Sequence, residues 1–107
     1  MRLGNICKGD IVVLSYPFTD LTNTKSRPAL VVHSADDDDV ILCAISSRKQ
    51  DQHCVALSHA DLRVQSFIRL NKIFTADKKL IGYKVGEIRK EKMKEVMAGL
   101  VNIITKP

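Results

Sequence analysis

Three nearly continuous apolar runs lie close together in the first half of the chain. They are Asp10–Phe18 (DIVVLSYPF), Pro28–Ser34 (PALVVHS) and Val40–Ser46 (VILCAIS), and all are rich in β-branched residues. Such residues favour strands, and a strand without polar alternation is buried on both faces or lies at the seam of a barrel or dimer. Because proline donates no ladder hydrogen bond, we expect Pro28 to be the first residue of the second strand.

The second half of the chain predicts shorter strands and a closing helix. The strands are expected at His53–Leu57 and Ser66–Thr75, and Leu80–Val85 is a brief apolar stretch before the helix. Neither face of Ser66–Thr75 is cleanly apolar, so either its polar side chains point toward a functional site or the strand is bulged. Apolar residues then recur at helical spacing: Met93, Val96, Met97, Leu100, Ile103 and Ile104. We therefore predict one domain over residues 1–107, mainly β with a C-terminal α-helix, built as a small SH3-like antiparallel β-barrel.

Composition restricts the possible partners and compartments. With 17 Lys and Arg against 12 Asp and Glu, the net charge is +5, which favours an anionic partner. No apolar run approaches the roughly 20 residues of a membrane-spanning helix, and the N-terminus lacks the apolar segment of a secretory signal. Cys7, Cys43 and Cys54 form no CxxC pair, as is typical of a reducing compartment. We expect a cytoplasmic protein without membrane association.

One group of residues in the sequence could bind or act on a charged ligand. The chain contains no nucleotide-binding, zinc-hydrolase or serine-hydrolase motif, so no cofactor and no metal are expected. His33 interrupts an apolar run and is more simply a core or edge histidine than a catalytic base. Donors instead gather near strand ends, and if the second, third and fifth strands are neighbours, these ends converge on one concave surface. A guanidinium and a hydroxyl there suit a phosphate, although ordinary surface cations remain the alternative. The donors are Arg27, Ser46, Ser47, Arg48, Lys49, Ser66, Arg69 and Lys72.

Several of these segments, taken in order, resemble a known family. GDIVVLSYPFTDLTNTKSRPALVV, VILCAISSR, SFIRLNKIFTADKKLIGYKVGEI and the closing helix are similar to the MazF/PemK family of toxin endoribonucleases, from about Gly9 to Leu100. The most specific elements are the GD and RPA strand starts and the ISS end of the third strand. The resemblance implies a homodimeric barrel that cleaves single-stranded RNA without a metal and is neutralised by a small acidic antitoxin.

The resemblance also implies roles for individual residues. In that family the arginine of the Arg-Pro motif and the hydroxyl residue ending the third strand act on the scissile phosphate, and these map onto Arg27 and Ser46. We expect Arg27 to be an electrostatic clamp and Ser46 to hydrogen-bond a non-bridging oxygen. The general base is left open between His33 and a backbone-held water. RNA-binding roles are predicted for Lys25, Ser47, Arg48, Ser66, Arg69 and Lys72.

The chain departs from the family pattern at three places. Ser46 stands where threonine is usual, Lys72 stands where several members have glutamine, and Leu21 and Thr22 replace the Ser-Glu pair of well-studied members. Two other functions stay open: a non-catalytic toxin of the same barrel fold that inhibits DNA gyrase, and an inactive RNA-binding module. The gyrase inhibitor would not need both Arg27 and Ser46, so their presence argues against it.

Overall fold

The computed structural model describes residues 6–17, 24–34, 38–47, 53–57 and 65–107. Within these residues six strands form one antiparallel sheet in the order β4-β5-β3-β2-β1-β6, and one helix follows it. This confirms the predicted mainly β fold with a C-terminal helix. The elements are β1 (Asp10–Pro17), β2 (Thr24–Ser34), β3 (Asp39–Ser46), β4 (Cys54–Leu57), β5 (Ser66–Asp77), the 3₁₀ turn η1 (Lys78–Leu80), β6 (Ile81–Glu87) and α1 (Lys90–Thr105).

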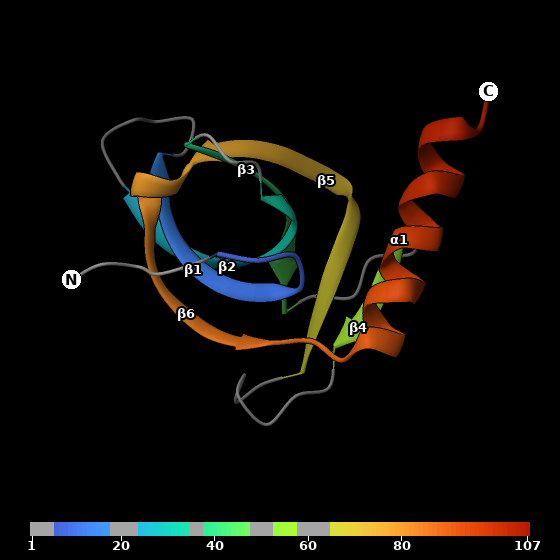
Figure 1. Cartoon of the computed structure of the whole chain (residues 1–107), viewed down its shortest axis with the longest axis horizontal. Coiled ribbons are helices and arrows are strands. Elements are labelled where there is room, and N and C mark those ends of the chain that lie inside the picture. The colour runs from blue at the N-terminus through green and yellow to red at the C-terminus, as the bar shows by residue number, and fades with distance from the viewer. Residues whose placement is uncertain (1–5, 18–23, 35–37, 48–52, 58–64) are drawn as a thin grey trace.

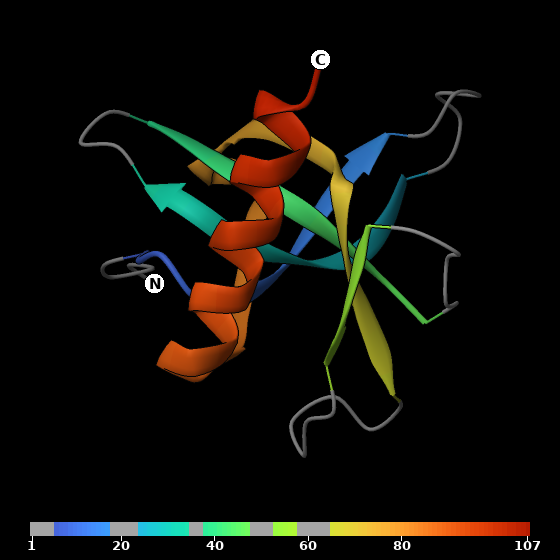
Figure 2. The ribbon, with the colours of Figure 1, turned by 90° about the vertical axis from the view of Figure 1, so that its right-hand side faces the viewer.

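The sheet curls strongly, so that in Figure 1 strands β1, β2, β3, β5 and β6 surround an almost circular outline. Strands β4 and β6 are the two edges, and in the described part of the chain no pairing joins them. The barrel that the sequence predicts is therefore present as a curled sheet that is not closed. Helix α1 lies beside β5 and β4 on one side of this sheet (Figures 1 and 2).

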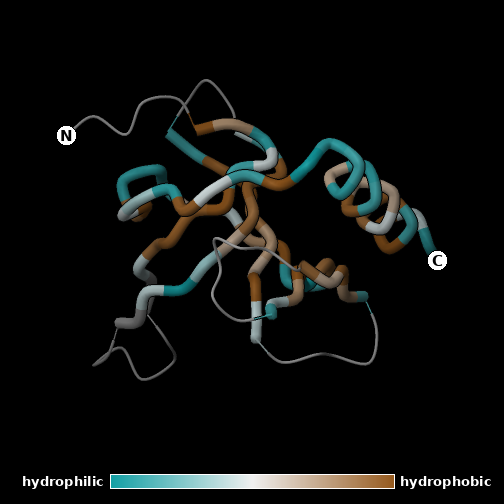
Figure 3. Tube along the Cα trace, turned by 90° about the horizontal axis from the view of Figure 1, so that it is seen from below, coloured by the Kyte–Doolittle hydropathy of each residue, from teal (hydrophilic) through white to brown (hydrophobic). Residues whose placement is uncertain are grey.

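The core lies on both faces of the central strands, as the continuous apolar runs predict. Neighbouring residues such as Ile11 and Val12 are both fully buried, and they belong to different hydrophobic clusters. One cluster includes Val96 and Leu100 of α1, and the other has Phe74 packed against it. In Figure 3 hydrophobic residues run along the strands, whereas α1 alternates between hydrophobic and hydrophilic residues. The sheet thus separates two layers of apolar packing.

Strand β2 begins earlier than the sequence indicates, so the expected start at Pro28 is wrong. It starts at Thr24, and Pro28 lies inside it opposite Val13 of β1. The register with β3 begins only at Ala29, so the first residues of β2 pair with β1 alone. A proline is tolerated there because the strand has an open edge on its other side. As a result, the start of β2 extends beyond β3.

Strand β5 is bulged, which settles the alternative that its sequence pattern left open. Cys43 and Ile45 of β3 are two residues apart, but their partners Ile73 and Ile68 are five apart. One residue of β3, Ala44, therefore faces residues 69–72 of β5. Such an insertion bends the strand and changes the direction of its side chains. The bend separates the part of β5 beside β4 from the part that joins the curl (Figure 1).

Helix α1 follows the predicted apolar spacing with one correction. Val96 and Leu100 are buried, and Met93, Met97 and Ile103 pack against the same cluster. Ile104, however, is 69% exposed. Adjacent helical residues point about 100° apart, so Ile103 and Ile104 cannot both face the core. Among the described helices there is none long and apolar enough to span a membrane.

Candidate functional site

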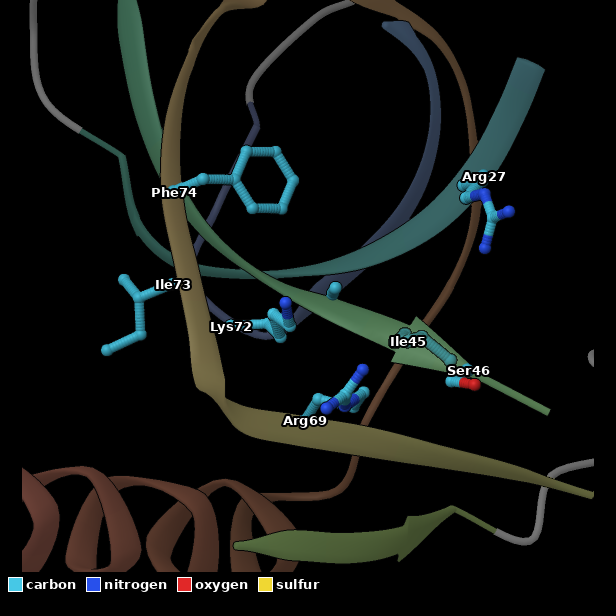
Figure 4. Close-up of a pocket in the computed structure, with 8 residues that line it drawn as sticks. Arg27, Ile45, Ser46, Arg69, Lys72, Ile73 and Phe74 are labelled. Carbon is cyan, nitrogen blue, oxygen red and sulfur yellow. The ribbon is translucent and has the colours of Figure 1, made fainter. Parts of the chain in front are cut away.

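Four of the predicted site residues line one pocket of about 330 Å³. They come from three adjacent strands: Arg27 from β2, Ser46 from β3, and Arg69 and Lys72 from β5 (Figure 4). Because β5, β3 and β2 are neighbours in the sheet, the ends of these strands meet on one surface. The remaining lining residues are Ala44, Ile45, Ile73 and Phe74.

The antiparallel register accounts for the meeting of Arg27 and Ser46. Ala29 of β2 faces Ala44 of β3 in the last pair between these strands, and Arg27 and Ser46 each lie two residues beyond that pair. Arg27 is exposed and Ser46 is half-buried. A guanidinium and a hydroxyl therefore lie at the same end of the pocket.

The bulge in β5 accounts for the presence of both Arg69 and Lys72. Two residues three positions apart in a regular strand point to opposite faces of the sheet. The inserted residues change this alternation, and both cationic side chains line the same pocket. Lys72 is exposed, whereas Arg69 is half-buried and its Nε atom is fully buried. Within the described residues this Nε has no hydrogen-bond partner.

The polar lining of the pocket consists of three cations and one hydroxyl. Guanidinium and ammonium groups only donate hydrogen bonds, and the described lining residues include no carboxylate. Ala44, Ile45, Ile73 and Phe74 supply apolar walls. A cationic pocket lined by these donors is suited to an anionic ligand that carries several acceptor oxygens, such as a phosphate.

A comparison with protein-family models identifies the chain. The model of the PemK-like, MazF-like toxins of type II toxin-antitoxin systems matches residues 7–104. The chain belongs to this family. The predicted resemblance is confirmed, and the protein is a type II toxin. By sequence, no individual curated protein matches it.

Solved structures support the fold of this toxin. One chain of the MazE–MazF crystal structure (Form-II) from Deinococcus radiodurans is 19% identical to this toxin, with 100% of both chains covered and a TM-score of 0.82. An endoribonuclease in complex with its cognate antitoxin, from a mycobacterial species, is 19% identical, with 96% of this chain and 98% of that chain covered and a TM-score of 0.76. The Mycobacterium tuberculosis toxin MazF-mt6 is 13% identical over 90% of this chain and 98% of that chain, with a TM-score of 0.72. These likenesses show a shared fold.

Among the other predicted RNA-binding residues of the toxin, Ser47 and Ser66 are described by the structure and do not line the pocket. Ser47 is exposed directly after β3, and Ser66 is buried, with 4% of its surface exposed. The backbone of Lys25 pairs with Tyr16 in β1, but its side chain and the whole of Arg48 lie outside the described residues. Their roles remain predictions.

The geometry does not support His33 as the general base of its own chain's pocket. His33 is exposed at the far end of β2, where it pairs with Ile41. It lies six residues beyond Arg27, which corresponds to about 20 Å along a strand. A general base must lie within hydrogen-bond reach of the proton that it accepts, directly or through one water. This leaves the backbone-held water as the candidate from the sequence.

The apolar walls of the pocket were missed in the sequence. Ile73 and Phe74 read as an ordinary part of an apolar strand, and Ala44 and Ile45 as part of the buried third strand. Only the polar ends of the strands gave a local signal. The described residues contain no group of three or more His, Cys, Asp or Glu side chains that could hold a metal ion.

Three titratable groups outside the pocket, Asp10, Lys84 and Cys43, belong to the scaffold of the toxin. The carboxylate of Asp10, 1% exposed, accepts a hydrogen bond from the Cys7 N–H at 2.8 Å and pairs with Lys84 Nζ at 3.2 Å. The hydrogen bond to Asp10 is the main cause that raises the pKa of Lys84, and Glu87 adds to it. Burial raises the pKa of the Cys43 thiol to about 11. These groups join β1 to β6 and fill the core.

Proposed function

We propose that this toxin is an endoribonuclease that cleaves single-stranded RNA, mRNA in particular, without a metal ion. The supporting observation is the convergence of Arg27, Ser46, Arg69 and Lys72 on one pocket of about 330 Å³. A volume of this size is within the range of sites that hold a small ligand. The family supports the same proposal, and one solved structure with this fold is described as an endoribonuclease.

In the proposed reaction the RNA supplies its own nucleophile. The 2′-oxygen forms a bond to phosphorus while the bond from phosphorus to the 5′-oxygen breaks. The 2′-hydroxyl gives its proton to the held water, which passes it to the solvent, and the leaving 5′-oxygen takes up a proton from solvent water. The products are a 2′,3′-cyclic phosphate and a 5′-hydroxyl end. No outside oxidant, reductant or co-reactant is required.

Arg27 and Ser46 act on the scissile phosphate in this proposal. The phosphoryl oxygens gain negative charge in the transition state, and Arg27, held at the rim by β2, stabilises that charge. The planar guanidinium grips two oxygens at once, and the Ser46 hydroxyl donates to a non-bridging oxygen. The serine keeps the donor of the threonine that is usual in the family.

Arg69 and Lys72 bind a phosphate next to the scissile one. Arg69 lines the pocket and is only half-buried, and its guanidinium carries four N–H donors besides the buried Nε–H for the oxygens of a phosphate. Lys72 is exposed beside it and contributes a mobile point charge. Binding at these two residues fixes the register of the RNA, because phosphate contacts position the strand without reading its sequence.

The test is the initial cleavage rate of a short RNA at fixed salt in the presence of EDTA. We expect Arg27→Ala to lower the rate by roughly 100- to 1,000-fold, the typical effect of removing one preorganised donor. Ser46→Ala should cost less, because a neutral hydroxyl forms a weaker hydrogen bond. Arg27→Lys should recover only part of the rate, since an ammonium lacks the planar fork. Arg89→Ala is the matched control: Arg89 is exposed at the start of α1, without a capping hydrogen bond.

Two results would contradict this function. If a folded Arg27→Ala variant cleaves at the wild-type rate, the proposed site is wrong. If the wild-type protein leaves RNA intact, the proposed activity is wrong. Inhibition of DNA gyrase by the same preparation would then favour the non-catalytic gyrase inhibitor. A substrate with a single 2′-deoxy nucleotide at the cleavage position tests the nucleophile, because it lacks the attacking oxygen and should stay intact.

The proposed protein partner is a small acidic antitoxin. An acidic segment would cover the Arg27 surface and compete with RNA for the same cations. Solved structures with this fold include an endoribonuclease in complex with its cognate antitoxin. Since exposed charges are screened by salt, we expect association to slow as ionic strength rises. Affinity that is independent of salt would indicate a different, apolar site.

We also propose that the toxin is a homodimer and acts in the cytoplasm. Large apolar side chains remain exposed, with Tyr83 at 58%, Val101 at 58% and Ile104 at 69%. Exposed apolar groups of this size favour an interface, and homodimers are the commonest oligomers. Sedimentation at micromolar concentration measures the oligomeric state directly. The cytoplasm follows from the mRNA substrate and from the free cysteines Cys7, Cys43 and Cys54.

A further inference from the structure

Helix α1 packs on β5 at the position where β5 is bulged, and Gly99 makes this close approach possible. A Cβ atom at Gly99 would overlap the Cδ1 atom of Leu70, and it would lie 3.8 Å from Leu70 Cγ. Leu70 is buried, with 5% of its surface exposed, in the cluster that includes Val96 and Leu100 of the helix. Because Gly99 has no side chain, the end of the Leu70 side chain fits against the helix at this position.

Leu70 lies within the bulge, between the two cations that β5 contributes to the pocket. Its side chain meets α1, and its backbone N–H donates to the carbonyl oxygen of His53, just before β4, at 2.8 Å. The bend of β5 is thus held from two sides at one residue. In Figure 4 this bend lies between Arg69 and Lys72, and α1 runs beneath it.

We propose that Gly99 is a positioning residue for the pocket, although it is not one of the residues that line it. By admitting Leu70 against α1, Gly99 sets the bend that directs both Arg69 and Lys72 toward the RNA. A side chain at position 99 would push Leu70 back and rotate the segment that carries both cations. The activity readout of this inference rests on the proposed function, but its structural readout does not.

Gly99→Ala is the direct test. The added methyl group crowds Leu70, but alanine is a better helix former than glycine, so the two effects on stability oppose each other. We therefore expect the melting temperature to change little. Cleavage of the short RNA should fall by about 10- to 100-fold, as follows from a displacement of the binding groups of about 1 Å. Most of the loss should be in KM, because Arg69 and Lys72 bind a flanking phosphate.

The structural readout is the NMR signal of the Arg69 Nε–H, measured without RNA and assigned with an Arg69→Lys variant. In Gly99→Ala this signal should move. Ala98→Gly is the matched control, because Ala98 is the exposed neighbour on the same helix. It weakens the helix by removing a methyl group that does not face β5, so the melting temperature should drop while the signal and KM stay unchanged.

A second substitution should rescue the first. Leu70→Val removes the Cδ atoms that the new methyl group would overlap and introduces a β-branched side chain suited to a strand. In the double variant Gly99→Ala/Leu70→Val we expect the Arg69 signal and KM to return toward wild type. Rescue by a smaller core residue distinguishes positioning from a general loss of stability.

Unchanged KM together with an unchanged Arg69 signal in folded Gly99→Ala would overturn the inference. If Gly99→Ala does not fold, Leu70→Val alone is compared with Leu57→Val, an equally conservative change in the same core cluster. Only Leu70→Val should move the Arg69 signal, and equal behaviour of the two variants would overturn the inference. If the wild-type protein cleaves no RNA, the proposed function fails, and the Arg69 signal still decides the role of Gly99.

Discussion

Arg69 should decrease the stability of the free toxin while it promotes RNA binding. Its Nε is buried and, within the described residues, lacks a hydrogen-bond partner, and the side chain shares its pocket with Arg27 and Lys72. A buried donor without an acceptor costs free energy in the folded protein. We therefore expect Arg69→Met to raise the stability of the free protein and to weaken its binding to RNA. A substitution that raises stability while it weakens binding is typical of a binding residue rather than a structural one.

The magnitude follows from what methionine keeps and removes. Methionine retains an unbranched apolar stem like that of Arg69 but has no buried N–H group. Leaving one such donor unsatisfied costs about 1–3 kcal/mol, so the variant should gain about 1–2 kcal/mol once the loss of other contacts is included. For a domain of this size that gain raises the melting temperature by about 5–10 °C. Loss of one phosphate contact should lower the slope of log K against log salt by about 0.7 for single-stranded RNA.

Melting curves without RNA and binding titrations at several salt concentrations provide the two measurements. Lys72→Met is the matched control, because it removes one cation from the same pocket but from an exposed side chain. It should lower the salt slope by a similar amount without raising the melting temperature. The reasoning is refuted if Arg69→Met melts below the wild type, or if both variants change the melting temperature equally.

Other substitutions test the scaffold. Asp10→Ala should lower the free energy of unfolding by about 2 kcal/mol in urea titrations, because it leaves the Cys7 N–H without its acceptor and separates Lys84 from its partner. Asp10→Asn should cost less, since an amide oxygen still accepts that hydrogen bond, and equal losses would contradict this account. Stability should also fall at alkaline pH: the pKa of Cys43 is raised to about 11 from 9.0, and that of Lys84 is raised from 10.5. When the pKa of a group is higher in the folded than in the unfolded state, its contribution to stability is complete below the unfolded-state pKa and is lost as the pH rises above that value. Urea titrations from pH 7 to 11 should therefore show a free energy of unfolding that declines from about pH 9.

Much of the fold could be predicted because the information is local. The runs that contain Ile11, Leu30 and Leu42 have no polar alternation, and each residue is fully buried in the curled sheet. The meeting of Arg27 and Ser46 could also be predicted, since antiparallel neighbours bring the start of one strand to the end of the next. The start of β2 could not, because the tolerance for Pro28 depends on where the pairing between β2 and β3 stops, which the sequence of β2 does not contain.

The bulge in β5 depends on contacts that no local pattern encodes. In the stretch SFIRLNKIF, strict alternation assigns Arg69 and Lys72 to opposite faces, yet both line the pocket. The contacts at the bend come from Gly99, far along the chain, and from the carbonyl of His53 before β4. The proposed catalytic pair is therefore set by strand order, whereas in our proposal the flanking cations are set by the packing of α1. Differences in RNA preference between toxins of this fold should thus arise from changes at the interface of α1 and β5 as well as from changes in the pocket itself.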